Sequence, residues 1–291
     1  MMSLLRWLSR RPLRFLHALG GLLGWLAWAL SPSYRRRLHA NAALAGISSA
    51  ARRASVAEAG RLTAELPRLW LRPRTQPIAD PVRWEGADWL ANLLETSTGV
   101  VLLTPHLGSF EVAAQAYAER FGARWPMSVL YRPARQAWLR ELEATARARD
   151  HLATAPATLA GVRQLMRALK KGETLGMLPD QVPPEGMGVW APFYGRPAYT
   201  MTLAARLAQQ TGAALAILWC ERLPGGAGYV VRAQPLAHPP ADGDDEVAAA
   251  TAINRSMEAV IAQCPAQYLW GYHRYKAPRR DGPATGQGAA P

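Results

Sequence analysis

Residues 100–111 read Val-Val-Leu-Leu-Thr-Pro-His-Leu-Gly-Ser-Phe-Glu, and they are the most informative stretch of the chain. An apolar run of strand length stops at a proline, a histidine follows at once, and a glycine opens the next segment. If that segment is a helix, His106 lies in the turn before it and Glu111 in its first turns. Both side chains then stand at the carboxyl end of a strand, where open α/β sheets place their ligands. Because a histidine beside a carboxylate is a general base with its orienting partner, we expect His106 and Glu111 to form such a pair.

The rest of the chain repeats the alternation of strand and helix. Strands are expected at residues 100–104, 127–131, 174–178, 213–221 and 229–234. Helices are expected at residues 86–95, 109–121, 136–149, 157–171, 200–210 and 244–262. The pattern predicts an α/β fold with a mainly parallel sheet flanked by helices, and a Pro/Gly-rich turn at 224–228 favours an antiparallel edge.

Three regions follow from the composition along the chain. Residues 1–75 form a basic region that is expected to be helical, with a helical pattern over 34–72. Prolines then mark a linker, and residues 76–280 carry the α/β pattern. Residues 281–291 are rich in Gly, Ala and Pro, and we expect a disordered tail there.

The bulk composition excludes several classes of protein. A chain of 291 residues can bury an ample core, and 49% hydrophobic with 19% charged residues fits neither a disordered chain nor a polytopic membrane protein. With only Cys220 and Cys264, and no CxxC pair, a disulfide framework or a cysteine-built zinc site is not expected.

The net charge of +13 is concentrated at the amino terminus, where residues 1–75 hold 13 arginines against two glutamates. These arginines flank the apolar run 15–30, which carries two tryptophans and, as a helix, would span roughly 24 Å against the ~30 Å of a hydrocarbon core. The run ends without a clear small-x-small cleavage site, so we expect a retained anchor at an anionic membrane. A cleaved signal and a buried core helix are the alternatives. The charge lies beside this segment and not on the α/β region, so nucleic acid is not an expected partner.

Other candidate residues follow the expected strands. Arg132 comes after the second strand and offers a planar fork to a phosphate or carboxylate, or else a surface salt bridge. Asp180 follows the third strand, where it either orients a substrate group or caps a helix. Ser109 lacks the Gly-x-Ser-x-Gly elbow of a serine hydrolase, so a helix cap is favoured over a nucleophile. No metal motif, dinucleotide fingerprint or phosphate loop is present, and we expect no metal or nucleotide cofactor.

The chain closes on an aromatic and basic run over residues 267–276. Trp270 is expected to be structural, whereas Arg274 and Lys276 are expected at the surface.

Taken in order, these segments resemble the bacterial lipid A biosynthesis acyltransferases, a lauroyl/myristoyl family within the wider glycerolipid acyltransferase group. The matching pieces extend over about residues 5–277, and the ordered set is more specific than any one of them. They are the basic apolar amino terminus, His106 to Glu111, Tyr131-Arg132-Pro133, the Asp180-Gln181 loop ending Phe-Tyr-Gly, and the closing run. Two departures, Arg135-Gln136 after Tyr-Arg-Pro and Tyr272-His273 near the end, bear on the identity of the acceptor.

The resemblance implies acyl transfer. His106 would act as general base with Glu111 as its partner, Arg132 would hold an acceptor phosphate, and Asp180 would help to bind substrate. Gly108 and Ser109 open the helix whose backbone amides would hold the oxyanion.

The implied donor is an acyl carrier protein thioester, with coenzyme A esters as the alternative. The implied acceptor is a lipid A precursor at the cytoplasmic face of the bacterial inner membrane. Another lipid acceptor (an ornithine lipid, lysophosphatidate or a phosphoinositol mannoside) and a non-catalytic basic membrane-binding protein remain as other interpretations.

Overall fold

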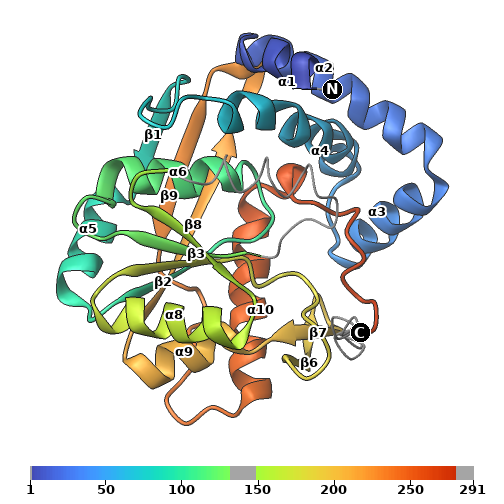
Figure 1. The fold of residues 1–291 in the computed structure, drawn as a ribbon. Helices are drawn as coiled ribbons and strands as arrows, with labels where there is room; N and C mark the ends of the chain where they lie inside the picture. The colour runs from blue at the N-terminus through green and yellow to red at the C-terminus, as the bar shows by residue number, and fades with distance from the viewer. Residues whose placement is uncertain (1, 132–148, 280–291) are drawn as a thin grey trace, which may run out of the picture.

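The computed structural model describes residues 2–131 and 149–279, and it confirms the α/β class (Figure 1). A seven-stranded sheet forms its centre, and every neighbouring pair of strands is parallel except β8 with β9. In spatial order the strands are β1 (Val82–Glu85), β9 (Tyr229–Gln234), β8 (Ala214–Arg222), β2 (Val100–Leu103), β5 (Thr174–Met177), β3 (Met127–Tyr131) and β4 (Leu152–Pro156). The antiparallel pair β8–β9 is the one that the turn at 224–228 predicts, but it does not form the edge of the sheet, because β1 pairs with β9 outside it.

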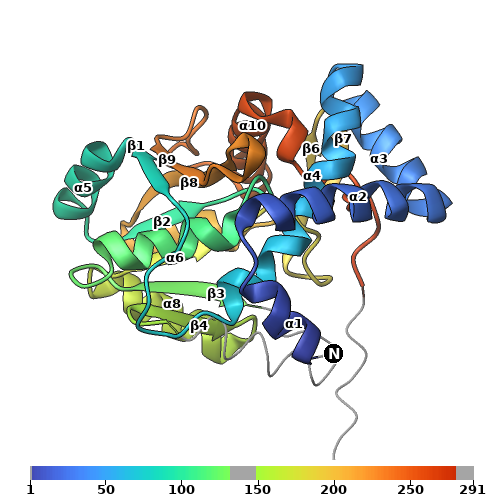
Figure 2. The ribbon, with the colours of Figure 1, turned by 90° about the horizontal axis from the view of Figure 1, so that it is seen from above.

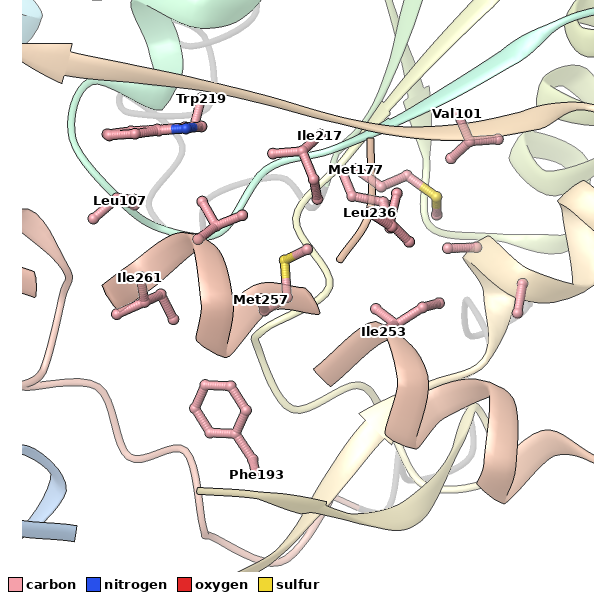
Figure 3. Packing of buried hydrophobic residues seen from close by; sticks show 14 of the residues in the cluster. Val101, Leu107, Met177, Phe193, Ile217, Trp219, Leu236, Ile253, Met257 and Ile261 are labelled. Carbon is pink, nitrogen blue, oxygen red and sulfur yellow. The ribbon is translucent and has the colours of Figure 1, made fainter. Parts of the chain in front are cut away.

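Helices cover both faces of the sheet and leave β2 and β5 buried along their whole length. One face carries α5 (Ala87–Thr96) and α6 (Phe110–Phe121), and the other carries α8 (Leu159–Lys170), α9 (Leu203–Thr211) and α10 (Glu246–Gln263). Figure 3 shows the second interface, where Val101, Met177 and Ile217 from the sheet meet Ile253 and Met257 on α10. All four residues of β2 are buried, which explains why its sequence is apolar throughout and does not alternate.

The Pro/Gly-rich segment between the strand expected at 174–178 and the helix expected at 200–210 is in part a β-hairpin. Strands β6 (Gly188–Phe193) and β7 (Arg196–Met201) pair antiparallel around Tyr194 and Gly195. Both turn residues have positive φ, 48° and 73°, which is the geometry of a type I′ turn. The Gly/Pro-rich composition therefore indicated the turn but gave no signal for the strands on either side of it.

The amino-terminal region is made of α1 (Met2–Ser9), α2 (Leu13–Leu30), α3 (Pro32–Leu44) and α4 (Ser49–Trp70). These helices gather on one side of the molecule in both ribbon views (Figures 1 and 2). The helical pattern over 34–72 corresponds to two helices, because the chain breaks after α3 at Gly46, whose φ is 65°. Ser48 then caps α4 by accepting a hydrogen bond from the Ala51 amide at 3.1 Å.

A buried polar cluster joins these helices to the sheet. Arg222 on β8 donates to Glu58 at 3.1 Å and to Glu65 at 3.3 Å, both on α4. His17 on α2 lies 3.1 Å from Glu65, and Tyr229 on β9 donates to Glu65 at 3.2 Å. Because these charged groups are buried and paired across three layers, the amino-terminal helices are packed into the fold.

Some predicted features lie outside the described residues. The helix at 136–149 falls almost wholly within 132–148, Arg132 lies there too, and the tail at 281–291 lies beyond residue 279. The short strands β1 and β4 were not expected from the sequence.

Candidate active site

His106 lies three residues beyond β2, at the carboxyl end of the sheet. Its backbone is held from a distant part of the chain, because the Leu269 amide donates to the His106 carbonyl at 3.1 Å. Leu107 forms a β-bridge with Tyr268 beside it. The closing aromatic segment thus fixes the loop that carries the histidine.

Asp180 is the partner of the His106 ring. It follows β5, which pairs directly with β2, and its Oδ1 lies 2.6 Å from Nδ1 of His106. Its Oδ2 accepts a hydrogen bond from the His106 backbone amide at 2.9 Å. Two contacts from one buried carboxylate set both the tautomer and the orientation of the ring, leaving Nε2 as the nitrogen that can take a proton.

The surroundings keep Asp180 ionised. Burial alone would raise the pKa of Asp180, but the charge of His106, its two hydrogen bonds and the charge of Arg274 outweigh burial and lower it. Tyr268 forms a hydrogen bond with the same carboxylate. Burial, the charge of Asp180 and this hydrogen bond raise the pKa of the Tyr268 phenol well above its ordinary value.

Gln181 is a site residue that the sequence did not single out. Its Nε2 lies 2.9 Å from Nε2 of His106, on the opposite side of the ring from Asp180. The amide therefore occupies the position from which a reacting hydroxyl would approach the base. Its place directly after Asp180 was the available signal.

The structure places Glu111 differently from the expectation. Both ring nitrogens of His106 have other partners, Asp180 and Gln181, so the orienting contact expected from Glu111 belongs to Asp180. Glu111 lies in the first turn of α6, is 8% exposed, and lines the same cavity as His106. The five-residue spacing brings the two to one cavity, and the strand order brings Asp180 to the ring.

Gly108 and Ser109 hold the loop in place. The Gly108 amide donates to the Gln267 carbonyl at 3.1 Å, and the Ser109 amide donates to the Cys220 carbonyl at 2.8 Å. Gly108 has a φ of 60°, and a side chain there would clash with the Cys220 carbonyl oxygen. Ser109 is at the cap position of α6 without a capping side-chain bond, and its buried Oγ has no hydrogen-bond partner among the described residues. The oxyanion donors expected at these two positions are thus already in use.

A large apolar cavity opens at His106. It has a volume of about 830 Å³, in the upper part of the range for small-molecule sites. Its walls are mostly aliphatic and come from both faces of the sheet, because α6 and α8 both contribute. Hydrogen-bonded pairing of β3 with β5 ends at Val129 and Gly176, and both residues line the cavity. Residues that represent its walls are Leu102, Ala114, Val129, Val162, Met166, Gly176 and Leu207.

Other candidate groups do not extend the site. Burial and the charge of Glu65 raise the pKa of the Cys220 thiol well above its ordinary value, so this thiol is not an activated nucleophile. Within residues 2–131 and 149–279, no cluster of three or more His, Cys, Asp or Glu side chains is arranged to hold a metal ion. Arg274, expected at the surface, is 2% exposed and donates to the Tyr199 carbonyl and the Thr200 hydroxyl, each at 2.7 Å.

A family model described as bacterial lipid A biosynthesis acyltransferase matches residues 1–277. The chain belongs to this family. It is 29% identical over 199 residues to the lipid A biosynthesis lauroyltransferase of Escherichia coli (strain K12), covering 67% of this chain and 62% of that relative. It is 28% identical over 195 residues to the lipid A biosynthesis palmitoleoyltransferase of the same organism, covering 66% and 60%. The lipid A biosynthesis acyltransferase of Shigella flexneri matches to the same extent as the palmitoleoyltransferase. The chain thus spans less than two thirds of the length of each of these three relatives.

Membership of the lipid A biosynthesis acyltransferase family confirms the resemblance carried by the ordered motifs. In this member of the family, the histidine of the first motif and the aspartate of the third meet at 2.6 Å across adjacent strands. The arginine of the second motif, Arg132, lies outside the described residues.

Proposed function

We propose that the protein is a membrane-associated O-acyltransferase that moves a fatty acyl chain from an acyl carrier protein thioester to a hydroxyl of a lipid A precursor. The observation that carries this proposal is the position of a hydrogen-bonded histidine in the wall of a large aliphatic cavity. A fatty chain fits such a cavity, and its thioester carbonyl would then lie beside the base. Family membership supports the same chemistry.

The proposed step needs no covalent enzyme intermediate. Nε2 of His106 takes the proton of the acceptor hydroxyl as the hydroxyl oxygen attacks the thioester carbonyl carbon. The carbon–sulfur bond then breaks, and the imidazolium returns the proton to the leaving thiolate. Asp180 stabilises the positive ring during this step, and Glu111, at the same cavity, adds a second negative charge.

The oxyanion that forms at the thioester carbonyl requires hydrogen-bond donors, which the start of α6 at Phe110 can supply. The first amides of a helix have no acceptor within the helix, and those of Gly108 and Ser109 are already bonded. Phe110 begins α6 and lines the cavity, so its amide is the proposed donor.

The side-chain pattern of α2 supports attachment to a membrane. Its first turns bury Leu13, Leu16 and His17, but beyond them the buried positions are the glycines Gly20, Gly21 and Gly24, while the large side chains of the second half face outward. A helix of a water-soluble domain has the opposite arrangement, with its large apolar side chains inside. The exposed apolar residues of α1 and α2 include Leu4, Trp7, Phe15, Leu22, Leu23, Trp25, Leu26 and Leu30. Of the described helices, α2 is long and apolar enough, by length and composition, to cross a membrane. The membrane to which the protein attaches is proposed to be the inner membrane, at its cytoplasmic face.

The test is acyl transfer by the purified full-length chain. Lauroyl-acyl carrier protein and a phosphorylated glucosamine disaccharide lipid are supplied, and the mass of the lipid product is measured. We expect addition of one acyl chain by the wild type and none by His106→Ala, whose circular dichroism spectrum stays native. Wild-type-like activity of His106→Ala would refute the base, and turnover of lysophosphatidate with none of the disaccharide lipid would refute the acceptor.

A further inference from the structure

A second cavity lies next to the first and shares His106 with it. It has a volume of about 240 Å³. Gln181 also borders both cavities, so the pair of nitrogens His106 Nε2 and Gln181 Nε2 stands at the junction. The remaining walls differ: Tyr34 on α3, Ala59 on α4 and the segment 268–272 enclose the small cavity.

We propose that this second cavity receives the hydroxyl-bearing end of the acceptor lipid, with α3 and α4 as one wall of the active site. This inference rests on the acyl transfer proposed above. It gives the amino-terminal helices a part in acceptor binding that attachment to a membrane does not require.

The geometry of the base supports this assignment. If the fatty chain fills the large cavity, the acceptor oxygen must reach Nε2 of His106 from outside it. The second cavity is also lined by His106, but most of its other walls differ from those of the first, and Asp180 and Gln181 both border it. A hydroxyl that enters there can replace the Gln181 amide, which lies 2.9 Å from Nε2.

The size and chemistry of the walls indicate what fits. A volume of 240 Å³ is below that of sites that enclose a whole drug-sized ligand, so this cavity holds one end of a larger molecule. Tyr34, Tyr268 and Tyr272 present aromatic walls that carry hydroxyl groups. Such amphipathic side chains suit a ring that has apolar faces and polar edges, as a sugar has.

The position of the cavity points to a ligand that comes from a membrane. Its outer walls, α3 and α4, belong to the same packed set of helices as α2, which turns its large apolar side chains outward. A lipid held at that surface would present its headgroup to the adjoining helices.

Helix α3 also shapes the wall opposite to it. Asn41 donates to the carbonyls of Trp270 and Tyr272 at 2.7 and 2.8 Å, and Arg37 donates to that of Gly271 at 3.2 Å. The ring of Tyr34 lies where a side chain on Gly271 would be. These contacts reach residues 268–272, whose Leu269 amide holds the His106 carbonyl.

The test narrows the cavity from α4. In Ala59→Leu the added side chain fills space beside Tyr34, and we expect the KM for the phosphorylated disaccharide lipid to rise roughly tenfold or more. The KM for lauroyl-acyl carrier protein should change by less than about twofold. Ala54→Leu is the matched control, since Ala54 is exposed on the same helix and borders neither cavity, and both its KM values should equal those of the wild type. If Ala59→Leu does not fold, Ala59→Val introduces a smaller obstruction and should give a smaller rise in the same direction.

The outcomes separate the two proposals. A rise in the KM for the acyl donor alone would assign the cavity to the donor's arm and overturn the inference while leaving acyl transfer intact. Unchanged values for both substrates in folded Ala59→Leu would show that the acceptor does not enter there. Absence of transfer by the wild type would refute the proposed function, and the inference with it.

Discussion

At the scale of single residues, the position of Asp180 determines what His106 can do. A carboxylate at 2.6 Å from Nδ1 fixes the proton there, so the free electron pair is on Nε2. The second contact, from the His106 amide to the same carboxylate, prevents rotation of one group without the other. Asp180, in the loop after β5, thus acts on His106 more directly than Glu111, which is closer to His106 in the sequence.

We predict that Asp180→Asn lowers the rate of acyl transfer by roughly 10³-fold or more, because an amide does not stabilise the imidazolium and permits the wrong tautomer. Glu111→Gln should have a smaller effect on kcat, since the Nδ1 atom of the ring is held by Asp180. Single-turnover rates with saturating donor measure the difference. A larger loss in Glu111→Gln than in Asp180→Asn would show that Glu111, and not Asp180, is the main support of the base.

The same substitution has a pH signature. The pKa of Asp180 is lowered in the fold, chiefly by His106 against the effect of burial, so its carboxylate contributes stability above the unfolded pKa of about 3.9. That contribution is lost as pH falls through the lower folded pKa. Thermal unfolding should therefore show wild type above Asp180→Asn at pH 7, with the gap closing below about pH 4. A gap that stayed constant down to pH 3 would argue against an ionised Asp180.

At the scale of helices and strands, the packing of α2 on α4 depends on glycine. A side chain on Gly24 would clash with the Val56 carbonyl oxygen, and one on Gly20 would lie 2.7 Å from the Arg61 Cα. Gly21 is different, because the nearest atom to an added side chain would be 3.7 Å away. Two of these positions therefore set the distance between the helices, and the third does not.

This difference provides a matched pair of variants. Gly24→Ala should destabilise the fold by about 1–3 kcal/mol, because the backbone of α4 must move to accept the methyl group. Gly21→Ala should be neutral or should stabilise by up to about 1 kcal/mol, since alanine favours a helix over glycine. Urea unfolding of both variants measures the two free energies, and equal losses would show that close approach is not the cause.

The sequence predicted those elements whose pattern is local. Buried strands such as β2 and β5 are apolar runs between turn signals, and their helices have the expected spacing. The edge strand β1 is only four residues long and half exposed, so its sequence carries little signal. The contact between His106 and Asp180 was not predicted for a related reason: it depends on the order of strands in the sheet, which the alternation of elements does not reveal.

At the scale of the whole molecule, the arginine excess and the outward apolar side chains belong to the same helices. Residues 1–75 hold 13 arginines and two glutamates, and α1 and α2 expose most of their leucine and tryptophan side chains. The few acidic groups of this region, Glu58 and Glu65, face inward to Arg222. The outer surface of these helices is therefore both cationic and apolar, as binding to an anionic lipid surface requires.

We predict that Leu22→Glu weakens this binding without loss of fold. Leu22 is 67% exposed on α2, so a carboxylate there costs the protein little, but at the lipid surface it removes an apolar contact and adds repulsion. Val247→Glu is the control, because Val247 is 46% exposed on α10, which lies on the sheet away from α1 and α2. The measurement is co-sedimentation with vesicles of anionic or zwitterionic lipid. At low salt, the wild type and Val247→Glu should sediment with the anionic vesicles, and a much smaller fraction of Leu22→Glu should do so.

Binding of the wild type should also depend on salt. Each arginine near an anionic surface adds about 1 kcal/mol that salt screens, so binding should weaken as salt rises but persist in part through the apolar contacts. Equal sedimentation of Leu22→Glu and Val247→Glu would place the lipid contact on another face of the molecule.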